Sequence, residues 1–176
     1  MRTSFALFFT LLCSVVLLAE SAAGLQWTAP AGWKNTGATS MRAATYAVAP
    51  ESGDATGGEC GVFFFGPGQG GSVKENIERW KSQITDAAGK PAPAKTATRK
   101  INGLNVTTID SSGEYAGMGG PAAPGKPAAG YRLLGAIVEG PGGNIFLKFT
   151  GPAKTIAANQ PKFEQLLASF KRGASM

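Results

Sequence analysis

A two-residue turn, Asn102-Gly103, constrains the fold of this chain more than any other short segment. Two stretches with strand composition flank it, at 96–101 and 104–111. The Asn-Gly pair favours a type I′ hairpin turn because both of its residues adopt positive φ. Tight turns of this kind join antiparallel neighbours, so the segment predicts an antiparallel sheet.

Four further strands are predicted, two before this hairpin and two after it. Residues 131–139 and 144–150 form a second hairpin around the Gly/Pro-rich turn at 140–143. Residues 40–48 alternate loosely, whereas 59–65 are mostly apolar and suit a central position in a sheet. Together the segments predict an antiparallel sheet of about six strands.

The first predicted helix begins at Ser72, where Glu75 three residues later completes a capping box. We expect it to end near Ala88, with Gly89 as its C-cap. One apolar stripe runs along it at helical spacing and is assigned to the core: Val73, Ile77, Trp80 and Ile84.

The second predicted helix spans residues 153–171, and its Phe163 and Leu167 are assigned to the core, together with Trp33 near the start of the domain. Pro161 predicts either a break at 159–160 or a kink. Two amphipathic helices can cover the two faces of one sheet. The predicted fold class is therefore α+β, an antiparallel sheet of about six strands flanked by two main helices as an α/β/α sandwich.

The N-terminal 23 residues have the features of a secretory signal peptide. Arg2 provides a positive charge, residues 5–18 form an apolar run too short for a comfortable membrane span, and small residues follow. We predict cleavage after Ala23 and a secreted or periplasmic protein with no transmembrane span after cleavage. An uncleaved anchor remains the alternative. Residues 24–176 then form a single domain, with a flexible Gly/Pro-rich loop at 116–130.

Composition removes several classes of catalytic and metal site. The chain has no histidine, which excludes Ser-His-Asp and Cys-His catalysis and every zinc site that needs imidazole. It has two cysteines, one of them inside the signal segment, so Cys60 is expected to be a buried thiol. No calcium-loop motif occurs, and no pair of carboxylates is marked as catalytic. We therefore predict no catalytic residue, no metal and no cofactor.

A glycine-rich segment at 66–71 has the spacing G-x-G-x-x-G between a predicted strand and a predicted helix. A dinucleotide site would also need a following parallel strand that ends in an acidic residue, and Asp86 falls instead at the end of the same predicted helix. A plain turn capped by Ser72 is the favoured interpretation. The alternative is that amide groups at Gly70, Gly71 and Ser72 hold an anion.

The formal net charge is +6, and a basic stretch contains Lys90, Lys95, Arg99 and Lys100. No aromatic residues are interleaved with these cations, so the pattern gives little support to nucleic-acid binding. A solvated edge that discourages strand-to-strand aggregation is the simpler interpretation.

Four segments carry a resemblance to a known family. They are WTAPAGW, SMRAATYAV, GGSVKENIERWKSQI and FLKFTGPAKTIAANQPKFEQLLASF. This pattern resembles exported bacterial proteins of unknown function with a P-x-G-W start and an N-x-x-R-W-x-x-Q helix, and it is similar to the wider PsbP/DcrB-like superfamily. The resemblance implies an antiparallel sheet sandwiched by helices and a location in the cell envelope. It implies no reaction.

The helix motif of this resemblance also supplies the candidate binding residues. On a helical wheel Asn76 and Gln83 share one flank, with Arg79 beyond them, and we expect this flank to face the 116–130 loop. Side-chain amides in such a place commonly bond to loop backbone, and binding of a ligand or partner is the alternative. The candidate binding set is Ser72, Gly70, Gly71, Asn76, Arg79 and Gln83.

The leading functional hypothesis is an exported, non-catalytic binding or accessory protein of the cell envelope. One alternative is a periplasmic carrier of a small ligand or lipid, with its site between the sheet and the 116–130 loop. The other is a carboxylate-dependent hydrolase. The expected partner is an envelope protein or a small ligand, and the sequence leaves its identity and the oligomeric state open.

Overall fold

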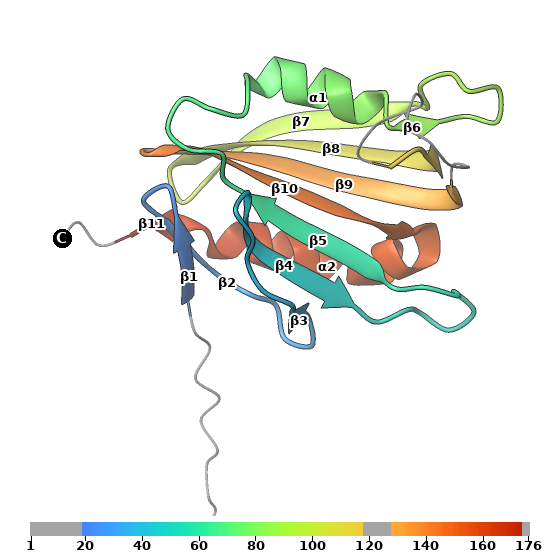
Figure 1. The fold of residues 1–176 in the computed structure, drawn as a ribbon, viewed down its shortest axis with the longest axis horizontal. Coiled ribbons are helices and arrows are strands. Elements are labelled where there is room, and N and C mark those ends of the chain that lie inside the picture. Colours follow the sequence, from blue (N-terminus) through green and yellow to red (C-terminus); the bar gives the residue numbers. More distant parts are fainter. Residues whose placement is uncertain (1–18, 118–127, 174–176) are drawn as a thin grey trace, which may run out of the picture.

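The protein is described by a computed structural model that covers residues 19–117 and 128–173 (Figure 1). Most of the predicted signal peptide and the centre of the predicted 116–130 loop lie outside the described residues. The described parts form an α+β structure in which one large antiparallel sheet carries a helix on each face.

The large sheet contains eight strands, all paired in the antiparallel sense. Their order is β3-β4-β5-β10-β9-β8, and both β6 and β7 pair with the outer edge of β8. The strand bounds are β3 (Lys34–Asn35), β4 (Arg42–Val48), β5 (Gly58–Phe63), β6 (Ile84–Thr85), β7 (Ala94–Ile101), β8 (Leu104–Tyr115), β9 (Ala128–Gly140) and β10 (Gly143–Pro152).

All six predicted strands are present, but the sheet is larger than the six strands expected. The two additional strands are β3, which pairs with Tyr46 and Ala47, and β6, which pairs with Glu114 and Tyr115. Each is two residues long, so neither has the alternating pattern from which a strand can be predicted. A separate three-stranded sheet consists of β1 (Ala19–Ala22), β2 (Leu25–Thr28) and β11 (Lys171–Arg172).

Helix α1 (Val73–Lys81) begins where the capping box predicts and ends earlier than expected. Ser82 is its C-cap, so the predicted continuation to Ala88 is wrong. The chain turns into β6 instead, because pairing with the end of β8 satisfies the backbone there. Ile84 is still fully buried, now from a strand rather than a helix.

Helix α2 (Ala153–Ser169) runs without a break through Pro161. Of the two predicted outcomes, the break at 159–160 is therefore wrong, and the kink stays a prediction. Proline removes one N–H donor from a helix, here the donor that would bond the Ala157 carbonyl. Both residues lie on the exposed side of the helix, where water can bond that carbonyl. The buried side of α2 continues to pack, through residues such as Phe163 and Leu167.

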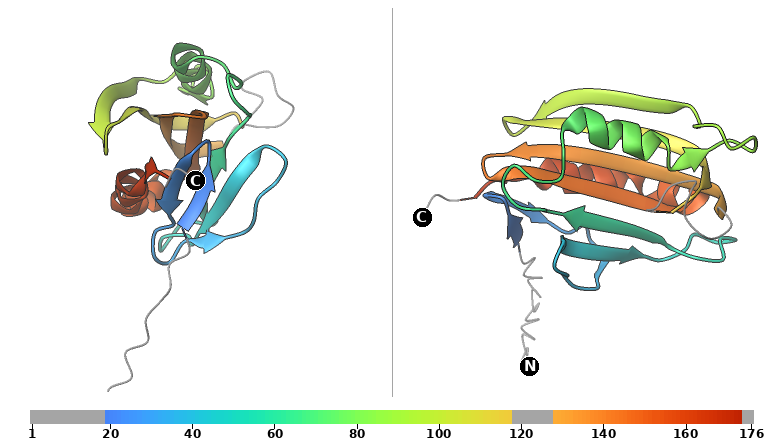
Figure 2. Two further views of the ribbon diagram at one scale, coloured as in Figure 1. Left: turned by 90° about the vertical axis from the view of Figure 1, so that its left-hand side faces the viewer. Right: turned by 45° about the horizontal axis from the view of Figure 1, so that its top comes forward.

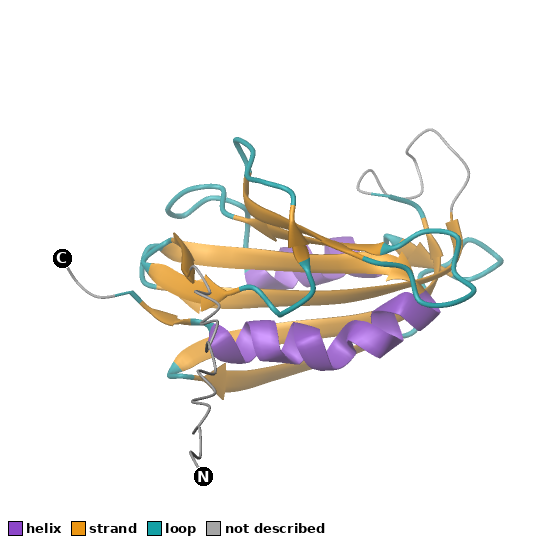
Figure 3. Ribbon diagram, turned by 90° about the horizontal axis from the view of Figure 1, so that it is seen from below, coloured by secondary structure: helices purple, strands orange, loops and turns teal. Residues whose placement is uncertain are grey.

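The two helices cover opposite faces of the large sheet (Figures 2 and 3). Along β9 the side chains alternate between two apolar cores: Leu134 and Val138 face α2, while Leu133 and Ile137 face α1. The layers are therefore those of the predicted α/β/α sandwich.

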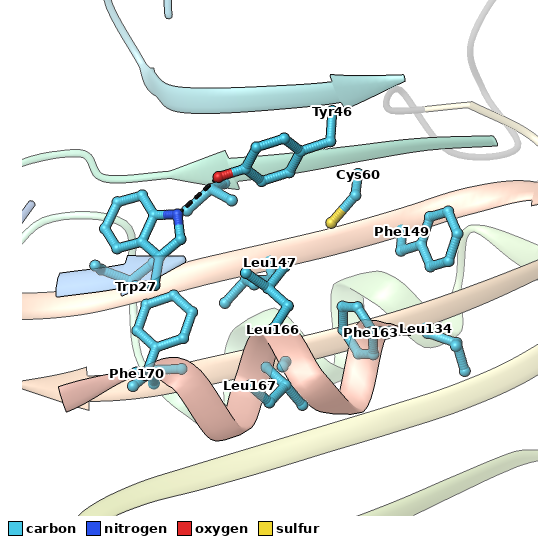
Figure 4. Packing of buried hydrophobic residues seen from close by; sticks show 14 of the residues in the cluster. Trp27, Tyr46, Cys60, Leu134, Leu147, Phe149, Phe163, Leu166, Leu167 and Phe170 are labelled. Atoms are coloured by element: carbon cyan, nitrogen blue, oxygen red, sulfur yellow. Dashed lines mark hydrogen bonds between the residues drawn. The ribbon is translucent and has the colours of Figure 1, made fainter. Parts of the chain in front are cut away.

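The core beneath α2 is the larger and includes Trp33, Phe163 and Leu167 (Figure 4). Cys60 is buried in this core as a free thiol, and burial raises its pKa. The α1 core contains Ile77, Trp80 and Ile84, whereas Val73 is only partly buried against it.

A hydrogen-bonded chain ties the N-terminal strand to the α2 core. The indole of Trp27 donates to the Tyr46 hydroxyl at 2.8 Å, and that hydroxyl donates to the Glu20 carboxylate (Figure 4 shows the first of these). The same carboxylate accepts from Asn35 at 2.6 Å. Burial is the largest cause that raises the pKa of Tyr46, and the hydrogen bond to Glu20 is the second. Signal cleavage after Ala23 stays a prediction, and cleavage there would remove both β1 and Glu20.

We predict that a chain beginning at Gly24 is less stable than one beginning at Ala19. Removal of β1 takes away the ladder to β2 and leaves the Tyr46 hydroxyl without its acceptor, which costs about 1–3 kcal/mol in the free energy of unfolding. Urea denaturation of the two chains measures the difference. A Glu20→Gln variant of the longer chain, which keeps an acceptor, is the control. Equal stability of the two chains would contradict a structural role for β1.

Candidate functional site

A pocket of about 460 Å³ lies between α1 and the face of β5 and β10, and we name it the α1 pocket. Its walls are mainly aromatic, and its polar groups come from α1 and from the sheet. The lining residues are Met41, Phe63, Phe65, Gly70, Gly71, Asn76, Arg79, Trp80, Gln83, Phe146 and Lys148.

The segment before α1 forms one rim of this pocket. Gly70 has φ +88°, and a Cβ there would lie 2.7 Å from the Phe146 ring and 2.8 Å from the Phe65 ring. Only glycine combines this backbone conformation with so close an approach. The chain can therefore pass directly over the two rings before the helix starts.

Ser72 and Glu75 form reciprocal hydrogen bonds at the start of α1. The Glu75 carboxylate accepts from the Ser72 amide at 2.8 Å, and the Ser72 hydroxyl accepts from the Glu75 amide at 3.2 Å. The Ser72 hydroxyl also donates to this carboxylate at 2.9 Å, and the two bonds that the Ser72 amide and hydroxyl donate to it lower the pKa of Glu75. Ser72 does not line the pocket, and the negative charge of Glu75 occupies the place that a bound anion would take.

Asn76 and Arg79 form the part of the pocket wall that α1 provides. The buried amide of Asn76 donates to the carbonyl oxygens of Gly70 at 2.8 Å and Ser72 at 2.9 Å. Its oxygen accepts from the guanidinium of Arg79, whose side chain is otherwise exposed. Asn76 thus fixes the glycine rim and also aligns a cation at the mouth of the pocket.

Lys148, in the middle of β10, brings a buried amine to the pocket. The residue is 7% exposed, and its Nζ donates to the side-chain oxygen of Gln83 and, at 2.9 Å, to the hydroxyl of Tyr115. Nζ also lies 4.9 Å from the centre of the Tyr115 ring, which stacks on Tyr131. The amine is thus held by neutral polar groups and an aromatic face.

The electrostatic surroundings of Lys148 disfavour its charged form. Burial, together with the positive charges of Arg79 and Arg42, lowers the pKa of Lys148 from its ordinary value of 10.5 to about 7. Arg42 itself bonds Glu59 at 2.8 Å and lies over the Phe63 ring. The amine therefore changes charge near neutral pH.

Two glycines flank Lys148 across the sheet, Gly61 on β5 and Gly135 on β9. A Cβ on Gly135 would lie 2.6 Å from the Trp80 ring, and one on Gly61 would lie 2.7 Å from the Phe63 ring. The missing side chains leave space for these two rings beside Lys148. Trp80 and Phe63 can therefore serve as walls of the pocket.

The structure brings five of the six predicted binding residues to one pocket. Gly70, Gly71, Asn76, Arg79 and Gln83 line it, and Ser72 does not. Of the described part of the 116–130 loop, Ala116 contacts this flank, because its amide donates to the backbone carbonyl of Gln83 at 3.0 Å. Asn76 bonds the segment before α1 instead, and residues 118–127 lie outside the described part of the chain.

The sheet side of the pocket was not predicted from the sequence. It consists of Met41, Phe63, Phe65, Phe146 and Lys148. One signal was present: Lys148 is a single charge within the apolar run Ile145 to Phe149, where a buried strand places every side chain inside the protein. A glycine in the interior of each neighbouring strand was a second signal.

The described residues show no group of three or more His, Cys, Asp or Glu side chains that could hold a metal ion. Within the same residues, no helix has the length and apolar character needed to cross a membrane.

Comparison with solved structures shows a PsbP-like fold. The cyanobacterial PsbP (CyanoP) of Synechocystis sp. PCC 6803 matches with a TM-score of 0.54 and 14% identity, over 94% of this chain and 98% of that chain. A protein of unknown function from Pseudomonas aeruginosa matches with a TM-score of 0.48 and 10% identity, over 87% and 94% of the two chains. No family model and no curated protein matches the sequence.

We predict that Gly135→Ala destabilises the protein by about 1–3 kcal/mol, because the new methyl group would overlap the Trp80 ring and the Ile109 side chain. The displaced indole should also change the near-UV circular dichroism spectrum. Chemical denaturation followed by near-UV circular dichroism measures both effects. Gly173→Ala, which needs no left-handed backbone and whose Cβ would meet its neighbours at 3.5 Å or more, is the control for losing a glycine, and it should leave the near-UV spectrum unchanged.

We predict that Lys148→Met makes the protein more stable at pH 6, by about 1–4 kcal/mol. Below pH 7 the folded protein holds a buried ammonium, and methionine fills similar space without charge. Between about pH 7 and 10.5 the unfolded chain binds more protons at this site than the folded chain, so wild-type stability rises with pH there. The advantage of the variant should therefore shrink by pH 9. Denaturation curves at both pH values measure it, and an unchanged advantage would contradict the assignment of the proton to Lys148. The exposed Lys74→Met is the matched control.

Proposed function

We propose that this PsbP-like chain is an exported, non-catalytic binding or accessory protein of the cell envelope, and that its binding site is the α1 pocket. The observation that carries the proposal is the convergence, in one cavity of about 460 Å³, of aromatic walls with a few oriented polar groups. Small-molecule sites in proteins commonly have this composition and size.

Support for export comes from the sequence. A positive residue, a short apolar run and small residues precede the domain, as in secretory signal peptides. A secreted or periplasmic location follows from this proposal. The expected partner is an envelope protein or a small ligand that meets the protein after export.

A small-ligand carrier is the second candidate, and the apolar character of the cavity favours it. Four aromatic rings reach the cavity, from Phe63, Phe65, Trp80 and Phe146. The expected site of such a carrier lay between the sheet and the 116–130 loop. The α1 pocket instead lies between the sheet, the helix and the glycine rim at 70–71. A carboxylate-dependent hydrolase gains no support from the pocket, because none of the described residues that line it has an acidic side chain.

The test is native mass spectrometry and affinity capture with protein recovered from its own cell envelope. Wild-type protein should carry a bound small molecule or capture one specific partner. Phe65→Ala should reduce that occupancy by about three- to tenfold, because it removes an exposed ring from the pocket wall. Gln69→Ala, in the same exposed segment but outside the pocket, is the matched control. Equal occupancy in wild type and Phe65→Ala would place binding elsewhere.

A further inference from the structure

The amine of Lys148 lacks an opposite charge. Among the described residues no carboxylate forms an ion pair with it, and its hydrogen-bond partners are the neutral side chains of Gln83 and Tyr115. The residues outside the described part contain no Asp or Glu in the sequence. Buried charges in proteins are normally paired, because an isolated ion loses its hydration without compensation.

The nearby carboxylate of Glu59 does not fill this role. It accepts a hydrogen bond from Arg42 at 2.8 Å, so its charge is engaged on the β4 side of the site. Arg79 and Arg42 add positive charge around Lys148 rather than compensating it. Below about pH 7 the pocket therefore carries positive charge at two of its lining residues, Lys148 and Arg79.

The apolar part of the pocket is left open to solvent. Met41 and Phe65 are 59% and 38% exposed, and they are the large hydrophobic residues that the described part of the chain exposes. Both line the α1 pocket. Phe65 stacks on Phe63 and leans on Phe146, so the exposed ring continues an aromatic surface into the cavity. Exposed apolar surface gathered at one cavity indicates a binding site.

We propose that the α1 pocket binds a small carboxylic acid with a flat apolar body, whose carboxylate pairs with Lys148 while the body lies against Phe65, Phe146 and Trp80. This inference rests on the proposed function, since it names the ligand class of the same pocket. A monoanion matches one buried ammonium, which has three N–H donors and gives two of them to Gln83 and Tyr115. The cavity of about 460 Å³ is large enough for a ligand of one or two fused rings.

Binding of such an acid should strengthen as the pH falls through neutrality. The anion pairs with protonated Lys148, and the ammonium form predominates below about pH 7. Other charged or titratable groups also face this amine: Arg79 from α1, Arg42 from β4, Glu59 from β5 and Tyr115 from β8. Tyr131, from β9, stacks on the ring of Tyr115. Burial raises the pKa of Tyr115, so its hydroxyl stays neutral in this range.

The experiment is isothermal titration calorimetry of the full purified protein with 2-naphthoate and with its neutral amide, 2-naphthamide. At pH 6.5 the wild type should bind the acid about tenfold or more tightly than the amide. Between pH 6.5 and 8.5 the affinity for the acid should fall by about tenfold, while the affinity for the amide stays constant. Acetate, which has the charge without the rings, should bind far more weakly than 2-naphthoate.

Lys148→Met should remove the preference for the acid, lowering its affinity by about 10- to 100-fold and leaving the amide nearly unaffected. Lys74→Met, on the exposed face of α1, should behave as the wild type. The comparison of acid with amide in the wild type does not depend on the variant folding.

Three results would overturn the inference, and they differ in what they say about the pocket. Equal affinity for acid and amide, with both lost in Phe65→Ala, would leave the pocket as the binding site and remove the anion preference. Absence of binding by all three probes at millimolar concentration would remove the small-molecule site itself. Binding of the acid that is unchanged in Lys148→Met would assign the anion to another cation.

Discussion

The pleat of β10 is the constraint on which the rest of the structure depends. This strand lies between β5 and β9 in the middle of the sheet, and Ile145 to Phe149 are all buried. Because successive side chains point to opposite faces, Ile145, Leu147 and Phe149 enter the α2 core, whereas Phe146 and Lys148 face α1. A shift of one residue in the register would exchange the two sets and place the lysine in the larger core. The same alternation that builds two cores thus delivers one amine to the α1 pocket.

The Lys148 amine lowers the stability of the fold that positions it. Loss of hydration and two neighbouring arginines both disfavour the ammonium, and an apolar residue of similar volume would fit the same space. Structural need alone does not account for a lysine at this position. Perturbed ionisable groups in a cavity are more common at functional sites than elsewhere, and the cost in stability is compensated when a ligand supplies the opposite charge.

The sequence predicted the elements whose signal is local. Hairpin turns such as Asn102-Gly103, the Ser72 cap and the apolar stripe of Ile77 and Trp80 each depend on a few adjacent residues. Elements that depend on distant partners were missed: β3 and β6 exist because long strands offer them free edges. The end of α1 was wrong for the same reason, since pairing with β8 competes with helix propensity after Lys81. Pro161 does not break α2, because the donor that it removes lies on the exposed side of the helix.

The candidate site was also predicted only where its residues are close together in the sequence. Its helical half was visible in the sequence because Asn76, Arg79 and Gln83 lie within eight residues of one another. The other half comes from strands that are far apart in the chain, so its members meet only after the sheet has formed. Gly61, Lys148 and Gly135 lie side by side on three adjacent strands. Without side chains on either flank, the sheet has room for the rings of Phe63 and Trp80 next to the amine.

The sheet side of the cavity therefore depends on two glycines, in β5 and β9, and on one lysine in β10, while the segment before α1 adds a rim. Backbone likeness cannot reveal such a feature, because a glycine and a larger residue can occupy the same strand position without changing the fold. A PsbP-like sheet accounts for where the three positions lie. The residues that occupy them determine what the pocket can bind, and here they combine aromatic walls with a single buried cation.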